Sequence, residues 1–280
     1  MTTTGNDQLP PLRDVIEQYE LGAKKSLGQH FLLDLNMTRK IARTASVNEN
    51  DVVLEIGPGP GGLTRALLET GSRVIAIEHD HRCIKALAEV SAAFDGRLSV
   101  IEADAMRAND AQILGENTPA KIVANLPYNI STELLIKWLK AGPALWSVMA
   151  LMFQKEVADR ILATPGSKTF GRLSVISQVA SRPSRAFNLP ARAFTPPPKV
   201  ESTVVLFEQP TSHFQHIAAL ERITQAAFSQ RRKMLRSSLK SLMGSQLHET
   251  LEAAEVKETQ RAEELTVEQF KKMAEFHEQR

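Results

Sequence analysis

The sequence of 280 residues contains a single cysteine, Cys83. One cysteine excludes an intramolecular disulfide and a zinc site built from several thiolates, and we expect no bound metal. No stretch approaches the roughly 20 apolar residues that a membrane-spanning helix needs. The first residues also lack the basic stretch and apolar core of a secretory signal. These absences predict a cytoplasmic protein with no membrane association, and a monomer is the default expectation.

The chain also lacks a large excess of charge of one sign. It contains 34 Lys and Arg residues and 32 Asp and Glu residues, which gives a formal net charge of +2. So small an excess does not by itself indicate nucleic-acid binding, and the distribution of charge matters more than its total. Hydrophobic residues make up 42% and charged residues 24% of the chain, which excludes a wholly disordered protein. The length allows one large domain with a small companion.

Short apolar segments alternate with helical patterns through the first two thirds of the chain. Strand-like segments lie at 52–56, 73–78, 98–102, 121–124, 147–153, 184–188 and 202–207, and helical patterns lie at 63–69, 80–90, 131–140, 155–162 and 173–180. The last two strands have no full crossover helix between them, so we expect an antiparallel pair at one sheet edge. The alternation predicts a Rossmann-like α/β fold, a doubly wound and mostly parallel seven-stranded sheet.

The composition changes after Pro210, where β-branched runs become rare and a charged helical pattern begins. We therefore predict an N-terminal leader at 1–22, a catalytic domain at 23–210 and a small all-α C-terminal domain at 211–280. A short helix is expected at 15–20 in the leader. Segment 22–33 is rich in glycine and is expected to be irregular, and Asp34 or Asn36 is expected to cap a helix that runs to about Ala45.

A glycine-rich segment, E-I-G-P-G-P-G-G-L-T from Glu55 to Thr64, follows the first strand. Gly57 and Gly59 allow a tight turn and a close approach to a ligand at the carboxyl end of the sheet. A dinucleotide site is the competing interpretation. The G-x-G-x-G spacing, the missing N–H groups of the two prolines and the acidic Glu55 disfavour a pyrophosphate. They favour a ligand with an amino group and a sulfonium, such as S-adenosylmethionine.

Two acidic residues follow the next strands. Glu78 ends the second strand, where a carboxylate can bind both hydroxyls of a ribose. Asp104, followed by Ala105, comes after the third strand, where it can lie near the adenine amine of a cofactor or can simply form a turn.

The segment Asn125-Leu126-Pro127-Tyr128 ends the fourth strand. The nitrogen of an aryl amine is a poor nucleophile because its lone pair is delocalised into the ring. If the Asn125 side-chain oxygen and the Leu126 carbonyl accept its two hydrogens, the nitrogen can pyramidalise toward a methyl group. Pro127 fixes the backbone that carries this carbonyl, and Tyr128 offers a face for stacking. The same four residues can also form an ordinary exit from a strand.

These motifs resemble the ribosomal RNA adenine N6,N6-dimethyltransferases, and most closely the bacterial small-subunit branch, the KsgA family. The resemblance runs from about Lys24 to the C-terminus. It rests on the segments Leu27–Leu32 (L-G-Q-H-F-L), Glu55–Gly61, Ile77-Glu78, Asn125–Tyr128 and Phe194–Ser202 (F-T-P-P-P-K-V-E-S). It implies a class I methyltransferase that dimethylates the N6 amines of two adjacent adenosines in a hairpin near the 3′ end of small-subunit (16S) ribosomal RNA during ribosome assembly.

The resemblance also implies the role of each site residue. Gln29, His30 and Leu32 close over the cofactor, and Gly57 and Gly59 bind its methionine part. Glu78 binds the ribose and Asp104 the adenine, while Asn125 contacts both the cofactor and the target amine. Phe194 is implied to stack on the target base opposite Tyr128, which would partly replace the stacking that the base loses when it leaves its helix.

A basic segment from Gln230 to Lys240 carries five basic residues and no acidic one. Basic helical faces bind phosphates without sequence preference, although such charges are more often simply solvated. We expect RNA contacts from Arg231, Arg232, Lys233, Arg236 and Lys240, to which Lys24 and Lys25 can add.

Two other functions remain open at this stage. The related family that methylates a large-subunit adenosine shares the fold and the Asn125–Tyr128 motif, although the Gly28–Phe31 and Phe194–Lys199 segments favour the small-subunit branch. A non-catalytic RNA-binding assembly factor is the alternative from another class.

Overall fold

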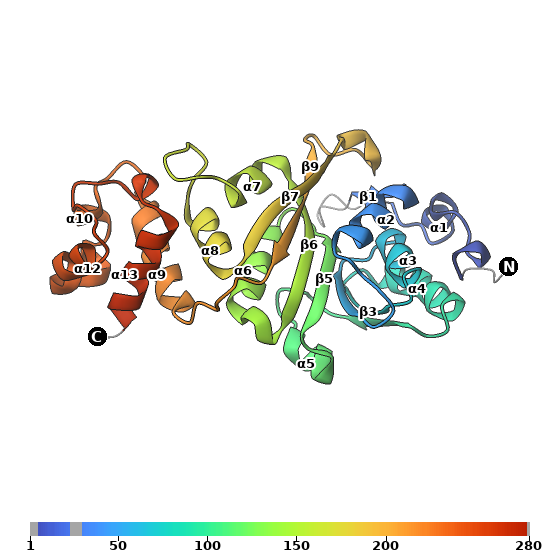
Figure 1. Ribbon diagram of the computed structural model, residues 1–280. Coiled ribbons are helices and arrows are strands. Elements are labelled where there is room, and N and C mark those ends of the chain that lie inside the picture. The colour runs from blue at the N-terminus through green and yellow to red at the C-terminus, as the bar shows by residue number, and fades with distance from the viewer. Residues whose placement is uncertain (1–4, 23–29, 279–280) are drawn as a thin grey trace. The chain divides into compact units, whose positions relative to one another are not determined.

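The computed structural model describes residues 5–22 and 30–278 of the chain (Figure 1). The described chain forms two compact units. Unit 1 contains the residues up to Lys155 together with Arg185–Phe207, and unit 2 contains Glu156–Ser184 and the residues from Glu208 onward. No described helix combines the length and the apolar character that crossing a membrane requires.

The central sheet has seven strands in the order β4-β3-β2-β5-β6-β9-β7. Their bounds are β2 Val52–Ile56, β3 Arg73–Glu78, β4 Leu98–Glu102, β5 Ala120–Asn125, β6 Trp146–Gln154, β7 Arg182–Leu189 and β9 Ser202–Glu208. The pairs from β4 to β6 are parallel. The predicted mostly parallel, seven-stranded sheet is thus confirmed, and β9 and β7 are neighbours at its edge, as expected.

The central strands are buried on both faces because helices cover the sheet. Val53, Leu54 and Ile56 of β2 are at most 2% exposed, as the continuous apolar run of a parallel strand requires. The helices of unit 1 are α1 Leu12–Gln18, α2 Leu35–Thr44, α3 Gly62–Leu68, α4 His81–Ala93, α5 Asp110–Leu114 and α6 Ser131–Ala141. Asp34 caps α2 by accepting a hydrogen bond from the backbone nitrogen of Asn36, as predicted.

A second, two-stranded sheet was not predicted. β1 (Phe31–Leu32) pairs antiparallel with β8 (Phe194–Thr195), so that Phe31 lies opposite Thr195 and Leu32 opposite Phe194. β1 falls inside the segment that the sequence analysis expected to be irregular. This pairing joins two segments that are far apart in the sequence and fixes both beside the central sheet.

The N-terminal leader is folded against α3 and α4. Arg65 of α3 donates to the backbone oxygen of Pro10 at 2.7 Å, and Arg82 of α4 donates to that of Glu20 at 2.6 Å. Val15 and Leu21 form a buried cluster with Cys83, so the lone cysteine is a buried thiol. All residues of α3 are buried. The helix α1 begins at Leu12, three residues before the start of the helix predicted at 15–20.

Unit 2 is helical. It contains α8 Arg172–Ala180, α9 Ile217–Ser229, α10 Leu235–Ser238, α11 Lys240–Met243, α12 Leu247–Ala253 and α13 Val267–Glu278, with nearly all of α7 (Lys155–Ile161). Its core joins Val175 and Val179 of α8 to Ile223 of α9 and Phe270 of α13. The predicted catalytic domain, 23–210, includes α7 and α8. They group with the C-terminal helices instead, because the apolar face of α8 shares their core.

Candidate active site

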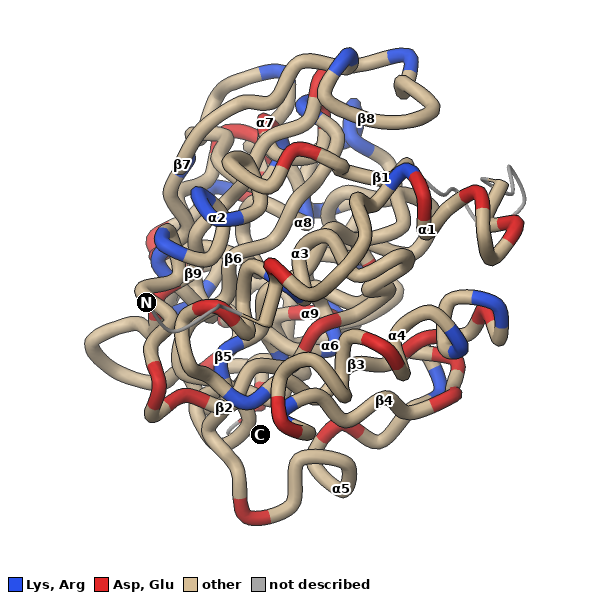
Figure 2. Tube along the Cα trace, turned by 90° about the vertical axis from the view of Figure 1, so that its right-hand side faces the viewer, with Lys and Arg blue, Asp and Glu red and all other residues tan. Residues whose placement is uncertain are grey.

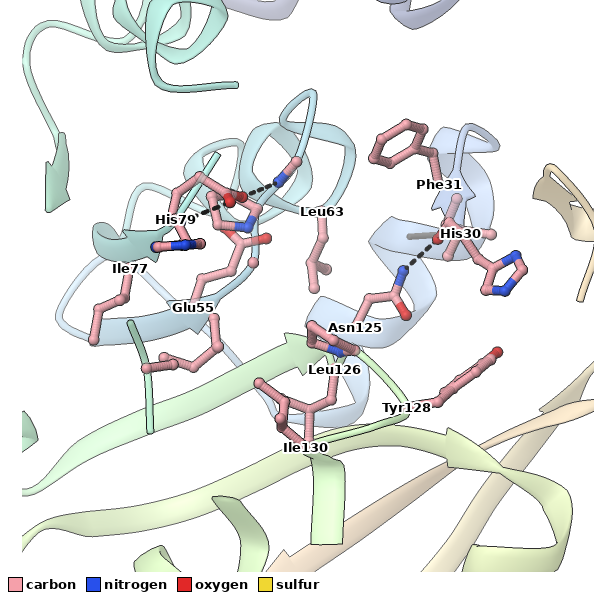
Figure 3. Close-up of a pocket in the computed structure, with 18 of the residues that line it drawn as sticks. His30, Phe31, Glu55, Leu63, Ile77, His79, Asn125, Leu126, Tyr128 and Ile130 are labelled. Atoms are coloured by element: carbon pink, nitrogen blue, oxygen red, sulfur yellow. Dashed lines mark hydrogen bonds between the residues drawn. The ribbon is translucent and has the colours of Figure 1, made fainter. Parts of the chain in front are cut away.

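A cavity of about 290 Å³ lies where β2, β3, β4 and β5 end, at the edge of the sheet where α/β folds bind ligands. The predicted site residues that line it are His30, Leu32, Glu55, Gly57, Gly59, Glu78, Asp104, Ala105, Asn125, Leu126, Pro127 and Tyr128. Gln29 lies outside the described residues. The structure therefore brings four of the five motif segments, together with Asp104 and Ala105, to one place (Figure 3).

The glycine turn needs residues without a side chain. Gly57, Gly59 and Gly61 have φ angles of 66°, 55° and 89°, which side-chain-bearing residues rarely adopt. A Cβ atom on Gly59 would also lie 3.1 Å from the ring of Phe31. The turn is therefore fixed by its backbone conformation and by β1, whose Phe31 ring lies next to Gly59.

Glu78 holds this turn from the neighbouring strand. Its Oε2 accepts a hydrogen bond from the backbone nitrogen of Gly59 at 3.1 Å, and its Oε1 accepts from those of His79 and Asp80, both at 2.8 Å. These bonds give the carboxylate a defined orientation at the cavity wall. Asp104 serves as a turn residue, since its Oδ1 accepts from the backbone nitrogen of Met106 at 2.9 Å. It also lines the cavity, so the two interpretations of Asp104 are compatible.

Glu55 is buried at the cavity wall, with 1% of its surface exposed. Its Oε2 has no hydrogen-bond partner among the described residues. Burial raises the pKa of the Glu55 carboxyl to about 8; the neighbouring Thr64 hydroxyl partly opposes the rise, and the nearby Glu78 carboxylate adds to it. The carboxyl is thus mostly protonated at neutral pH, which weakens the argument that its charge repels phosphate. The unpaired Oε2 of Glu55 still fits an ammonium group, whose charge would favour release of the proton.

Asn125 and Pro127 lie directly beside the glycine turn. The side-chain nitrogen of Asn125 donates to the backbone oxygen of His30 at 3.1 Å. A Cβ atom on Gly57 would lie 3.7 Å from Cδ of Pro127, so a side chain at position 57 would contact the proline ring. Leu126 is almost fully buried, which holds the backbone between Asn125 and Pro127.

Tyr128 is held by a residue that the sequence analysis did not assign to the site. Its hydroxyl group shares a hydrogen bond of 2.7 Å with Oγ of Ser202. Burial raises the pKa of the Tyr128 phenol. The ring centroid of Tyr128 is 5.5 Å from that of His30, and Nδ1 of His30 lies 2.8 Å from the backbone oxygen of Pro196. Ser202 is the last residue of the Phe194–Ser202 motif. The sequence therefore pointed to this segment, but it did not show that Ser202 bonds to Tyr128.

Phe194 does not line the cavity. It is 2% exposed and belongs to the hydrophobic core that contains Leu32 and Val204. The expectation that it stacks on the target base opposite Tyr128 is therefore not met in this structure. The reason is the β1–β8 pairing, which places Phe194 opposite Leu32. The ring found beside Tyr128 is that of His30 (Figure 3).

The basic segment lies in unit 2 and is mostly irregular. Arg231 is used within the unit, because its Nε donates to Glu263 at 2.6 Å and its Nη2 to the backbone oxygen of Ser167 at 3.3 Å. The remaining predicted RNA contacts are exposed, namely Arg232, Lys233, Arg236 and Lys240. Lys24 and Lys25 lie outside the described residues. Only part of the predicted set is thus both exposed and free of such bonds.

Comparison with known proteins gives a consistent result. Residues 21–279 match the model of a family described as ribosomal RNA adenine dimethylase. A relative named ribosomal RNA small subunit methyltransferase A from Chelativorans sp. (strain BNC1) is 54% identical over 272 residues, covering 96% of this chain and 98% of the relative. The protein of the same name from Agrobacterium fabrum is 52% identical, with the same coverage.

Solved structures agree in fold. A dimethyladenosine transferase from Plasmodium falciparum superposes with a TM-score of 0.74 at 28% identity, covering 87% of this chain and 96% of that one. The 23S rRNA methyltransferase ErmE superposes with a TM-score of 0.65 at 24% identity, covering 88% of this chain and 98% of that one. At that identity, the second match shows a shared fold only.

Proposed function

The chain belongs to the ribosomal RNA adenine dimethylase family, and from this membership we propose its reaction, cofactor and substrate. The protein is an S-adenosylmethionine-dependent methyltransferase. It places two methyl groups on the N6 amine of each of two adjacent adenosines, in a hairpin near the 3′ end of small-subunit (16S) ribosomal RNA. The observation that carries this proposal is the fixed Asn125 amide beside Tyr128 and the glycine turn.

The cavity suits the three parts of the cofactor. The unpaired oxygen of Glu55 fits the amino group of the methionine part, and the Gly57–Gly59 turn leaves room for the chain that joins it to the sulfonium. Glu78 is oriented for the ribose hydroxyls, and Asp104 and Ala105 lie where the adenine would bind. Bound S-adenosylmethionine supplies a methyl group on a positively charged sulfur, which departs as a thioether.

The Asn125–Tyr128 segment then acts on the target amine. The Asn125 side-chain oxygen and the Leu126 carbonyl accept its two hydrogens, which draws the lone pair out of the ring and toward the methyl carbon. The nitrogen–carbon bond forms as the carbon–sulfur bond breaks, and the nitrogen then loses a proton to water. No strong base is required, because the amine becomes acidic only once it carries the methyl group. Much of the acceleration comes from orientation.

A second methylation uses the same groups. The monomethyl product still carries one hydrogen on the nitrogen, so one acceptor can position it again. The target base must leave its stack to reach the cavity, and the face of Tyr128 partly replaces the lost stacking.

The test is transfer from labelled S-adenosylmethionine to purified ribosomal subunits that lack the modification, followed by mass mapping of the methylated nucleosides. We expect dimethyladenosine in small-subunit RNA and no label in large-subunit RNA, with the Asn125→Ala protein as the inactive control. Label in large-subunit RNA would assign the protein to the large-subunit activity. Binding of small subunits without any transfer would identify a non-catalytic assembly factor.

A further inference from the structure

The loop that follows β4 carries the adenine end of the proposed cofactor site. Ala103, Asp104 and Ala105 line the cavity. The backbone nitrogens of Arg107 and Ala108 donate to the backbone oxygen of Asp104 at 3.0 and 2.9 Å, which closes a turn. Three of the six residues at 103–108 are exposed, so packing alone holds this segment weakly. We call residues 103–108 the adenine loop.

Lys137 of α6 holds the adenine loop from outside the cavity. Its Nζ donates to the backbone oxygen of Ala105 at 3.0 Å and to that of Ala108 at 2.7 Å. The same Nζ lies 2.9 Å from Oδ2 of Asp110, the first residue of α5. An ammonium group has three N–H donors, so these three acceptors account for all of them. Lys137 thereby ties two carbonyl groups of the loop to one point.

Buried neighbours keep the Lys137 ammonium group in place. Charged residues of both signs are spread along the described chain (Figure 2), and an exposed ion pair contributes little to stability. The pair of Lys137 and Asp110 is different, because Asp110 is 3% exposed and its Oδ2 also accepts from Nε1 of Trp138 at 2.8 Å. The Trp138 side chain is fully buried, and charge-assisted hydrogen bonds are the stronger ones. The pair is therefore a firm anchor for the loop.

The helix α6 also begins at the segment proposed to act on the target amine. Oγ of Ser131, the first residue of α6, donates to the backbone oxygen of Tyr128 at 3.1 Å. The backbone nitrogen of Ile130 donates to the backbone oxygen of Pro127 at 3.2 Å. Lys137 follows Ser131 by two turns or less, roughly 9 Å along the helix axis. One helix thus fixes both the catalytic segment and, through Lys137, the adenine loop.

We propose that Lys137 is a positioning residue for the cofactor, an inference that rests on the proposed function. Lys137 does not line the cavity, and it acts through the carbonyl groups of Ala105 and Ala108, which orient the backbone next to Asp104. With the loop held, the adenine of S-adenosylmethionine meets a preformed site. Without Lys137, binding of the cofactor has to order the loop, and this cost weakens affinity. The transfer step should change little, because other residues hold the reacting groups.

The test variant is Lys137→Met, which removes the ammonium group and keeps an unbranched side chain. The matched control is Lys121→Met. Lys121 is also partly buried, pairs with Asp51 at 2.9 Å and donates to the backbone oxygen of Ser46 at 2.6 Å. It lies near the start of β5, at the end of the strand away from Asn125 and the cavity. The control therefore removes a similar ion pair without touching the adenine loop.

A second variant covers the case in which Lys137→Met is too unstable, because the single change leaves the buried Asp110 carboxylate without its partner charge. The double variant Lys137→Met with Asp110→Asn removes both charges and so leaves no unpaired charge in the interior. It still lacks the donors to the adenine loop. The inference therefore predicts the same cofactor defect for the double variant as for Lys137→Met.

Three measurements are made on the full-length proteins. Calorimetric titration gives the Kd for S-adenosylhomocysteine, and transfer to undermethylated small subunits gives the KM for S-adenosylmethionine and kcat. Hydrogen exchange of the amides of Arg107 and Ala108 is followed in the cofactor-free protein. Lys137→Met should raise Kd and KM roughly 10-fold and leave kcat within about twofold, and it should speed exchange of the loop amides. Lys121→Met should lower the free energy of unfolding and leave these four quantities unchanged.

A cofactor analogue separates positioning from a general loss of stability. S-inosylhomocysteine carries an oxygen where the adenine has its amine, so it cannot donate to the Asp104 carboxylate. The wild-type protein should therefore bind it more weakly than S-adenosylhomocysteine. Lys137→Met should lose most of this preference, because Asp104 is no longer held toward the amine, and Lys121→Met should keep it.

Wild-type Kd, KM and analogue preference in the Lys137→Met protein, or in the double variant if the single one does not fold, would overturn the inference. Equal cofactor defects in the Lys137→Met and Lys121→Met proteins would also overturn it, since they would show a structural role only. Failure of the wild-type protein to bind S-adenosylhomocysteine or to methylate small subunits would instead overturn the proposed function.

Discussion

The side-chain nitrogen of Asn125 donates a hydrogen bond to the backbone oxygen of His30, 3.1 Å away, across 95 positions of sequence. Because an amide has its donors on one side and its acceptor on the other, this bond decides which way the Asn125 oxygen faces. Figure 3 shows the nitrogen turned toward His30 and the oxygen turned away from it, into the space that Tyr128 also borders. The contact therefore presents the acceptor that the target amine needs.

Replacing Asn125 with alanine should lower methyl transfer by about 10²–10³-fold, since an oriented group that stabilises the transition state is lost. RNA binding should be largely unchanged. Single-turnover transfer and subunit binding measure the two effects separately. Asn129→Ala is the matched control, because Asn129 lines the same cavity but is exposed. Near-normal turnover in the Asn125→Ala protein would show that the amine-acceptor role is wrong.

The ring of Tyr128 should matter more than its hydroxyl group. Tyr128→Ala removes the stacking face and should raise the KM for RNA by roughly 10-fold or more, since stacking of a base on an aromatic ring contributes about 1–3 kcal/mol. Tyr128→Phe and Ser202→Ala each remove only the 2.7 Å hydrogen bond and should have smaller, similar effects. If Tyr128→Phe lowers transfer as much as Tyr128→Ala, the ring does not act by stacking.

Glu55 should make the stability of the cofactor-free protein depend on pH. Its pKa is raised from 4.5 to about 8 in the folded state, so between these values the folded protein holds a proton that the unfolded chain has released. The contribution of Glu55 to the free energy of unfolding is therefore full below about pH 4.5. It falls by about 1.4 kcal/mol per pH unit as the pH rises toward 8. The Glu55→Gln protein lacks this loss, and its unfolding free energy relative to wild type should increase with pH across that window.

The same variant should bind S-adenosylmethionine more weakly, because glutamine cannot supply a negative charge to the ammonium group. Denaturant unfolding at several pH values and calorimetric titration of the cofactor measure the two effects. An unfolding free-energy difference that stays constant from pH 5 to about 8 would show that Glu55 is not buried as a neutral acid.

The leader should stabilise the helix that follows the glycine turn. Leu12 is 5% exposed, and a Cβ atom on Gly62 at the start of α3 would lie 3.1 Å from its Cδ1. Leu12→Ala should lower the free energy of unfolding by about 2–5 kcal/mol and weaken cofactor binding, because the turn loses support. Arg13→Ala, at the exposed neighbouring position, is the control for denaturant unfolding. Equal stability of the two variants would mean that the leader does not support α3.

Many features of the fold could be predicted because their causes are local. The predicted bounds of β3 and β4 coincide with those in the structure, and the Asp34 cap of α2 was anticipated. An alternating apolar pattern, a capping side chain and a run of glycines each act within a few residues, so the sequence displays them directly. The same holds for the cavity residues, since strand ends in a parallel sheet meet at one edge.

Other features depend on contacts between distant residues, which no local pattern displays. The β1–β8 pairing buries Phe194 and brings His30 to Tyr128. The helix α8 shares a core with α9, so it groups with unit 2 and not with the predicted catalytic domain. The charge state of Glu55 is also of this kind. From the sequence alone, a glutamate is expected to carry a negative charge at neutral pH. In the folded protein, burial raises the pKa of the Glu55 carboxyl to about 8.

The sequence by itself therefore determined which chemical groups stand at the ends of the strands, because their order and spacing are written along the chain. Only the tertiary structure decided how those groups are oriented and charged. Orientation and charge are set by neighbours such as the backbone oxygen of His30 and the hydroxyl group of Ser202, and these come within reach only when the chain is folded.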